Sequence, residues 1–145
     1  MNPQHVRAML DNDLEEWEAL VLDLEAHPDA VLHDPASPGW TARDVYAHLA
    51  RWMEHSTSSL EAYVAGRDQP SPIEGTDDEI NARWQAEDAA LTLDDARSRA
   101  ETQFERRSQV IESVPAERWD KAVEAFAHAD GAQHYRAHRN AIVRS

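Results

Sequence analysis

Apolar residues recur at steps of three and four along the first part of the chain, the spacing that places them on one face of a helix. The resulting stripe predicts a single helix over residues 3–26 and consists of Val6, Met9, Leu10, Leu14, Trp17, Leu20, Val21 and Leu24. Pro3 suits the first turn of this helix, where a missing N–H costs nothing. Pro28 ends it, because the residue before a proline is pushed out of the helical region.

A second helix is predicted from Thr41 to about Ala65. The Thr41 side chain can accept the backbone N–H of Asp44, and the Asp44 carboxylate suits the positive end of a helix. Gly66 suits the C-terminal stop. The inward face is predicted to include Val45, His48, Leu49, Trp52, Leu60 and Val64.

The rest of the chain predicts a long loop and three further elements. Glycine and proline punctuate residues 66–76, which form the longest predicted loop. Thr76 starts a helix that runs to about Ala90, and Thr92 starts another that closes at Pro115. Residues 115–119 predict a short turn or helix. After a brief connection, the last helix is placed at 130–144, with residues 130–133 as its cap.

No segment shows the sustained alternation of a strand, and glycine is scarce. Four main helices with substantial connections predict an all-α fold, an antiparallel four-helix bundle with an additional short helix. We expect residues 1–145 to form a single domain.

Composition narrows the chemistry. The 145 residues include no Cys, which excludes disulfides, thiolate metal sites and a cysteine nucleophile. A formal net charge of −14 disfavours phosphate backbones and anionic membrane surfaces, so neither a nucleic-acid partner nor a membrane partner is expected. No apolar run reaches the roughly 18 residues of a membrane span, and the N-terminus shows no signal-peptide core. We therefore expect a cytoplasmic protein in which any metal is held by His, Asp or Glu.

Three of the eight histidines form a candidate metal site. His134 and His138 lie four residues apart on the predicted last helix and so project from one face. His48 lies on or beside the buried stripe of the second helix, where an unpartnered polar ring would be costly. A bundle can bring the three imidazoles together, and three His with open water positions describe a catalytic type of site. The alternative is that His134 and His138 are solvated or lie at the edge of the core, and that His48 is a core histidine whose ring is hydrogen-bonded within the protein.

The protonation of these histidines is open at the level of sequence. The helix dipole disfavours the imidazolium form of His134, whereas the acidic surroundings favour it. His55 and Glu54 could support the site, but solvent exposure is the expected alternative. His5, His27, His33 and His128 are expected on the surface or in loops.

The segment Gly39–Trp52, with Asp44-Val45-Tyr46-Ala47-His48 at its centre, resembles the start of the second helix in DinB-like four-helix-bundle proteins. Residues 81–83 and 131–138 resemble the ClbS/DfsB branch in particular. The resemblance implies an up-down-down-up bundle and a divalent metal, commonly zinc or nickel, held by His48, His134 and His138. It also implies kinship with thiol S-transferases and with the metal-binding domain of maleylpyruvate isomerase. Homodimers are frequent in the superfamily.

Three functions follow as hypotheses. The first is a metal-dependent enzyme that transfers a low-molecular-weight thiol to a small electrophile, or hydrolyses such a substrate, in stress or detoxification. Arg51 or Arg136 could then hold an anionic cosubstrate, and Tyr46 or Tyr135 could donate hydrogen bonds, although ion pairing and packing are the alternatives. The second is a metal-independent hydrolase or sequestering protein of the ClbS type. Its pocket would be lined by Trp40, Trp52, Trp84 and Trp119. The alternative is that these tryptophans are ordinary core aromatics. The third is a non-enzymatic interaction module.

Overall fold

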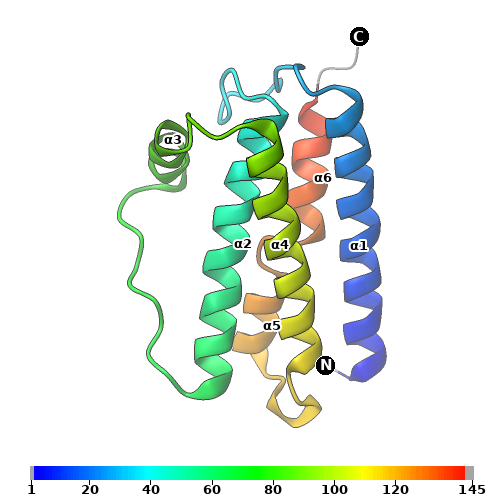
Figure 1. Cartoon of the computed structure of the whole chain (residues 1–145). Coiled ribbons are helices and arrows are strands. Elements are labelled where there is room, and N and C mark those ends of the chain that lie inside the picture. The colour runs from blue at the N-terminus through cyan, green and yellow to red at the C-terminus, as the bar shows by residue number, and fades with distance from the viewer. Residues whose placement is uncertain (1, 143–145) are drawn as a thin grey trace.

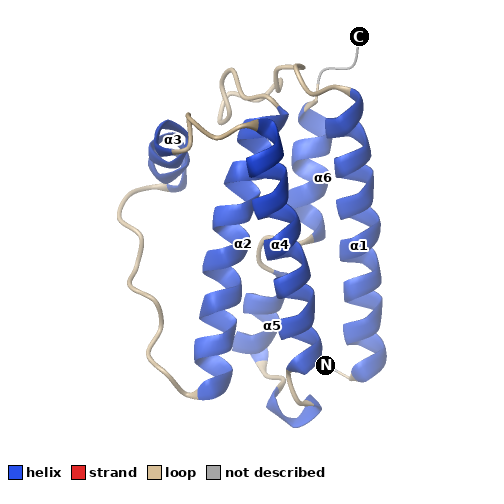
Figure 2. Cartoon of the chain, viewed as in Figure 1, coloured by secondary structure: helices blue, strands red, loops and turns tan. Residues whose placement is uncertain are grey.

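A computed structural model describes residues 2–142 of the chain. Within this range the regular structure is helical, and the one β-type contact is an isolated antiparallel bridge between Leu32 and Ile142 (Figure 2). The helices, in chain order, are α1 (Pro3–Ala26), α2 (Ala42–Ala65), α3 (Asp77–Glu87), α4 (Leu93–Ser113), the 3₁₀ turn η1 (Ala116–Arg118), α5 (Lys121–His128) and α6 (Ala132–Ala141).

The long helices form an up-down-down-up bundle, as predicted (Figure 1). Helix α1 rises from the N-terminus, α2 and α4 both descend, and α5 followed by α6 rises again. The fourth position of the bundle is therefore shared by two short helices, and α3 lies outside it against the upper part of α2.

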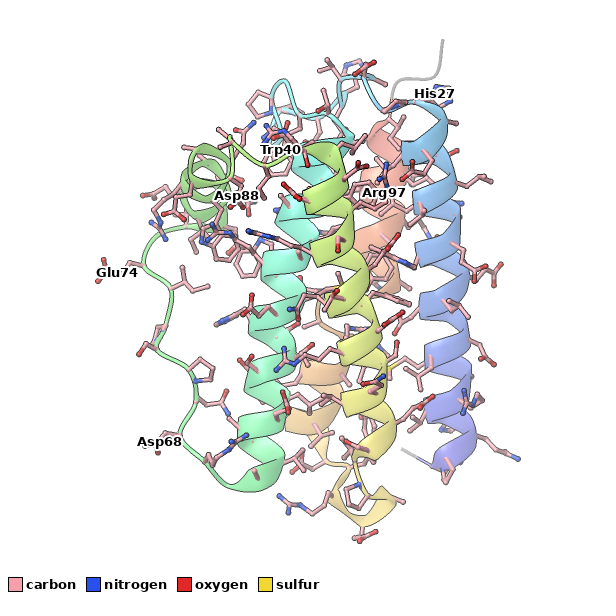
Figure 3. All side chains as sticks on the ribbon, viewed as in Figure 1. His27, Trp40, Asp68, Glu74, Asp88 and Arg97 are labelled. Carbon is pink, nitrogen blue, oxygen red and sulfur yellow. The ribbon has the colours of Figure 1, made fainter. Side chains whose placement is uncertain are left out.

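The parallel course of α2 and α4 requires the chain to climb back along the bundle. Residues 67–76 make this climb as a strap that stands apart from α2 in Figure 1. Asn81 of α3 contacts Trp52, which lies 13 residues before the end of α2, so the strap and the start of α3 rise about 20 Å at about 1.5 Å per residue. Asp68 and Glu74 project from the strap into solvent (Figure 3).

Two apolar clusters fill the bundle. The upper one is centred on aromatic rings: Trp17 stacks on Phe104 with centroids 4.8 Å apart, and Tyr135 meets Trp17 edge-on at 5.2 Å. The lower one includes Leu60 and Val123, so it joins α5 to α2. Each buried large side chain contributes about 1.5–3 kcal/mol, which makes these clusters the main source of stability.

The end of the chain differs from the predicted helix over 130–144. A helix, α5, occupies residues expected to form a connection, and α6 spans only Ala132–Ala141. The predicted cap is wrong, because Asp130 has a φ of 58° and Gly131 precedes α6 without a side-chain cap bond. Ile142 leaves the helix to pair with Leu32, and residues 143–145 lie outside the described residues.

Two smaller expectations also fail. Helix α3 ends at Glu87 rather than near Ala90, because the chain turns over residues 88–90. The predicted apolar stripe of α1 includes Leu14, but this side chain is 45% exposed. Among the described residues, no helix combines the length and the apolarity needed to cross a membrane.

Candidate metal centre

The predicted histidines meet between α2 and α6. His134 Nε2 lies 3.0 Å from His48 Nε2 and 3.0 Å from His138 Nε2. His48 and His138 are 7% and 6% exposed, and His134 is partly exposed. The four-residue spacing on α6 directs His134 and His138 to α2, while Tyr135 turns into the aromatic core and donates to Met53 Sδ. The structure thus brings together all three residues of the predicted site.

The arrangement of the three Nε2 atoms fits coordination of a shared cation better than it fits hydrogen bonds among the rings. An imidazole nitrogen carries either one hydrogen or one lone pair, so His134 Nε2 can make one good hydrogen bond but not two. Two nitrogen ligands about 2.05 Å from a cation lie about 2.9 Å apart at a right angle and about 3.3 Å apart at the tetrahedral angle. The observed 3.0 Å separations fall in this range. The cluster could therefore hold a metal ion.

Burial keeps two of the rings in the form that binds metals. Loss of solvation lowers the pKa of His48 well below its usual value, with a further contribution from the neighbouring rings. The same cause lowers the pKa of His138 to about 3, with His134 acting in the same direction and Asp34 opposing it. Both imidazoles are neutral at pH 7 and offer a lone pair. Burial thus outweighs the acidic surroundings at these two positions.

Two of the Nδ1 atoms, those of His48 and His134, have no hydrogen-bond partner. His134 Nδ1 lies 3.3 Å from Asp130 Oδ1, outside hydrogen-bond geometry. His48 Nδ1 and Trp40 Nε1 are both buried without a hydrogen-bond partner, and the two rings meet edge-on with centroids 5.0 Å apart. Both residues line a cavity of about 10 Å³ between α2 and α3, whose lining also includes Asp88. This is near the minimum volume for one water molecule.

Helix α3 is fixed over the site by polar contacts to α2. Trp52 Nε1 donates to Asn81 Oδ1 at 2.8 Å, and the Trp52 and Trp84 rings lie 4.9 Å apart. The Arg51 guanidinium forms two hydrogen bonds to the Asp88 carboxylate, at 2.9 and 2.8 Å. These bonds explain the motif at Asn81 in physical terms, because its amide joins α3 to the helix that carries His48.

A cavity of about 540 Å³ opens beside the three histidines. Its lining comes from four helices, α2, α3, α5 and α6, from the loop before α2 and from the turn between α5 and α6. It consists of Asp34, Ala36, Ser37, His48, Trp52, His55, Ser56, Ser59, Asp77, Asn81, Phe126, Ala129, Asp130, His134, Ala137 and His138. Its volume suits a small organic molecule. A hollow of about 590 Å³ on another side of α2 shares only His55 with this lining.

The remaining candidate residues occupy other surroundings. Arg51 pairs with Asp88 and Glu87, and Arg136 pairs with Glu16. Tyr46 is buried and donates to Glu25 rather than facing the histidines. Of the tryptophans, Trp52 lines the cavity, Trp40 packs behind His48, Trp84 covers α2, and Trp119 packs in the lower cluster. Glu54 is exposed, whereas His55 is partly buried at the cavity wall.

A buried ion pair that was not predicted determines where α6 begins. Arg107 Nη1 of α4 donates to Asp13 Oδ2 of α1 at 2.6 Å, with both side chains almost fully buried. Asp13 Oδ1 accepts the first backbone N–H of α6, from Ala132, at 3.0 Å. Arg107 Nη2 donates to the Ala127 carbonyl near the end of α5. Both charges occupy the buried register of their helices, three residues after Leu10 and Phe104, and this signal is present in the sequence.

An up-down-down-up helical bundle with three convergent histidines has the architecture of a DinB-like protein. The chain belongs to the family described as the mycothiol maleylpyruvate isomerase N-terminal domain, whose family model matches residues 14–139. This family is part of the DinB-like superfamily, whose members often bind metals. Comparison with curated proteins and with solved structures gave no match.

Proposed function

We propose that this protein binds a divalent metal ion, zinc or nickel, through His48, His134 and His138 and uses it to act on a small electrophile. The simplest reaction is the transfer of a low-molecular-weight thiol, and mycothiol in the description of the family supports this choice. The observation that carries the proposal is the convergence of three Nε2 atoms beside a cavity large enough for a small molecule.

The donor set favours a borderline metal. Imidazole suits zinc and nickel, whereas magnesium and calcium prefer oxygen ligands. Three protein ligands also leave coordination positions for exogenous groups, as in catalytic rather than structural sites. A bound metal would act as a Lewis acid and lower the pKa of a thiol or water bound to it.

The residues of this chain supply binding and orientation. The chain has no Cys, so the reacting thiol must come from a cosubstrate. His48 and His138 remain neutral because they are buried, and His134 completes the set at the cavity wall. Trp52 and Phe126 provide an apolar wall for the organic part of a substrate. We assign no general base.

Metal content tests this proposal directly. Tag-free protein analysed by inductively coupled plasma mass spectrometry should hold close to one zinc or nickel ion per chain, or take one up on titration. His48→Ala and His134→Ala should lose it while circular dichroism still shows a folded bundle. His128→Ala is the matched control, because it removes an exposed imidazole from the end of α5. Wild-type protein that stays free of metal in the presence of Zn²⁺ and Ni²⁺ would contradict the proposal.

The aromatic wall also supports a second candidate, a ClbS-like protein that hydrolyses or sequesters a reactive small molecule without a metal. Residues 81–83 and 131–138, which resemble the ClbS/DfsB branch, contribute Asn81, His134, Ala137 and His138 to the cavity. Metal-free protein would then remove electrophiles from solution or show tryptophan quenching that disappears in Trp52→Phe. The absence of any response across electrophile classes, with no metal bound, would leave a non-enzymatic interaction module.

A further inference from the structure

Acidic side chains surround the cavity beside the histidines. Asp34 comes from the loop before α2, Asp77 from the first turn of α3, and Asp130 from the turn before α6. No Lys or Arg is found among the described residues of the lining. The described lining thus has formal carboxylate charges without a Lys or Arg side chain to balance them.

The arginines of the flanking helices are engaged elsewhere. Arg51 on α2 is paired with Asp88 and Glu87. On α6, Arg136 and Arg139 both form ion pairs with the carboxylate of Glu16, on α1. None of these three arginines lines the cavity, so none is positioned to neutralise an anion bound there.

The serine hydroxyl groups of the lining also act as hydrogen-bond acceptors toward a ligand in the cavity. Ser56 donates to the Met53 carbonyl and Ser59 to the His55 carbonyl, at 3.3 and 3.0 Å. Ser37 donates to Asp34 Oδ2 at 3.4 Å. A hydroxyl has one hydrogen, so each of these groups has only lone pairs left for a ligand.

We propose that the lining of this cavity favours cationic or uncharged, donor-rich small molecules with an apolar part over carboxylates and phosphates of similar size. The proposal rests on the proposed function and narrows its substrate class. An ammonium or a polyhydroxylated group would meet the carboxylates and serine oxygens, while Trp52 and Phe126 would contact the apolar part. A dicarboxylate such as maleylpyruvate would meet three carboxylates and no Lys or Arg of the lining, so a bound divalent metal would be its main favourable charge in the cavity.

Three thiols of similar size and different charge test the selection. Cysteamine is cationic, 2-mercaptoethanol is neutral and 3-mercaptopropionate is anionic. Each is titrated into Co²⁺-loaded protein at low ionic strength, and binding is followed by the sulfur-to-cobalt charge-transfer band. We expect 3-mercaptopropionate to bind at least about tenfold more weakly than cysteamine, a ratio equivalent to about 1.4 kcal/mol.

A matched pair of variants separates the cavity from intrinsic thiol chemistry. Asp34→Asn/Asp77→Asn should reduce the cysteamine-to-mercaptopropionate ratio at least about threefold, equivalent to about 0.6 kcal/mol. Glu101→Gln/Glu105→Gln removes the same charge from exposed positions of α4 and should leave the ratio unchanged. Equal cysteamine-to-mercaptopropionate ratios in the wild type and both double variants would overturn the proposal. Asp130 is left intact because it lies beside His134.

A protein that does not load Co²⁺ would count against the proposed function, and the charge selection is then tested without metal. Fluorescence of Trp52 at the cavity wall, isolated as the difference from Trp52→Phe, should show a higher ratio of caesium to iodide quenching than free N-acetyltryptophanamide does. Asp34→Asn/Asp77→Asn should weaken that preference more than Glu101→Gln/Glu105→Gln does. The same preference in both variants would overturn the selection independently of any metal.

Discussion

Gly131 packs so closely against Arg107 that a Cβ at position 131 would lie 2.5 Å from Arg107 Nη2. The same Cβ would lie 2.9 Å from Asp13 Oδ1, so the buried ion pair occupies the space that a side chain would need. Gly131 comes immediately before α6 and three residues before His134. The position of the site is thereby coupled to an ion pair between α1 and α4.

Gly131→Ala should destabilise the protein and loosen the metal site. Overpacking of a buried site costs about 1–3 kcal/mol, and relief of the clash requires α6 to move. We expect a lower unfolding free energy in urea and weaker Zn²⁺ binding. Gly66→Ala is the control, because Gly66 adopts a φ of 70° at the end of α2 with open space around it. It should cost about 1–2 kcal/mol of stability and leave Zn²⁺ affinity unchanged; the same loss of affinity in both variants would count against the coupling.

Removal of one member of the buried pair should be more harmful than replacement of both. Arg107→Met leaves the Asp13 carboxylate buried without its partner, which costs about 3–5 kcal/mol. Asp13→Leu/Arg107→Met removes the unpaired charge and should recover part of that loss in urea unfolding. Additive losses would show that the two side chains act independently.

The metal-free protein should lose stability on acidification below neutral pH. Burial lowers the pKa values of His48 and His138 below the ordinary value of about 6.5, and that of His138 to about 3. Between these pH values the unfolded state binds more protons, so the histidine contribution to stability is fully present above about pH 6.5 and declines as the pH falls. From pH 7.5 to 5.5 we expect a loss of about 1–3 kcal/mol, measured by urea unfolding in EDTA.

His138→Gln should show a shallower pH dependence in the same experiment, because it removes one of the two buried rings. His128→Gln removes an exposed imidazole and serves as the control. Identical slopes in wild type and His138→Gln would contradict the assignment of this pH dependence to the buried site.

The strap over residues 67–76 should tolerate lengthening but not shortening. Its ten residues reach at most about 33–36 Å, and deletion of residues 68–71 reduces that limit to about 20 Å, which is the climb itself. The deletion should release α3 from Trp52 and Arg51, detected as faster amide exchange over residues 77–87. Insertion of four Gly/Ser residues should cost only about 1 kcal/mol or less; protected α3 amides in the deletion variant would contradict this account.

The sequence predicts those parts of the fold that depend on local periodicity. Helices α1, α2 and α4 follow from long apolar stripes, and Gly66 ends α2 in the left-handed conformation, as expected. Helix α5 has only two turns, too few for a clear stripe, although Val123, Phe126 and Ala127 mark one face. Asp120 caps it by accepting the Val123 N–H at 2.8 Å.

The candidate site is also predictable only where it depends on local spacing along one helix. The spacing of His134 and His138 indicates a shared face, but the approach of His48 depends on how α2 and α6 pack. Ser37, Phe126 and Asp130 reach the cavity from separate segments, and no local pattern connects them. The Asp13–Arg107 pair is intermediate, because opposite charges at the buried positions of two stripes already indicate a partner for each.

The distance along the chain between His48 and the α6 histidines has a consequence during synthesis. Helix α2 leaves the ribosome long before α6, so His48 can be covered by Trp40 and α3 while the other two ligands have not yet been translated. The nascent chain then offers only one of the three imidazoles of the candidate site, and one ligand binds a cation weakly. Metal acquisition through the three proposed ligands would thus be delayed until residue 138 has emerged and α6 has packed against α1.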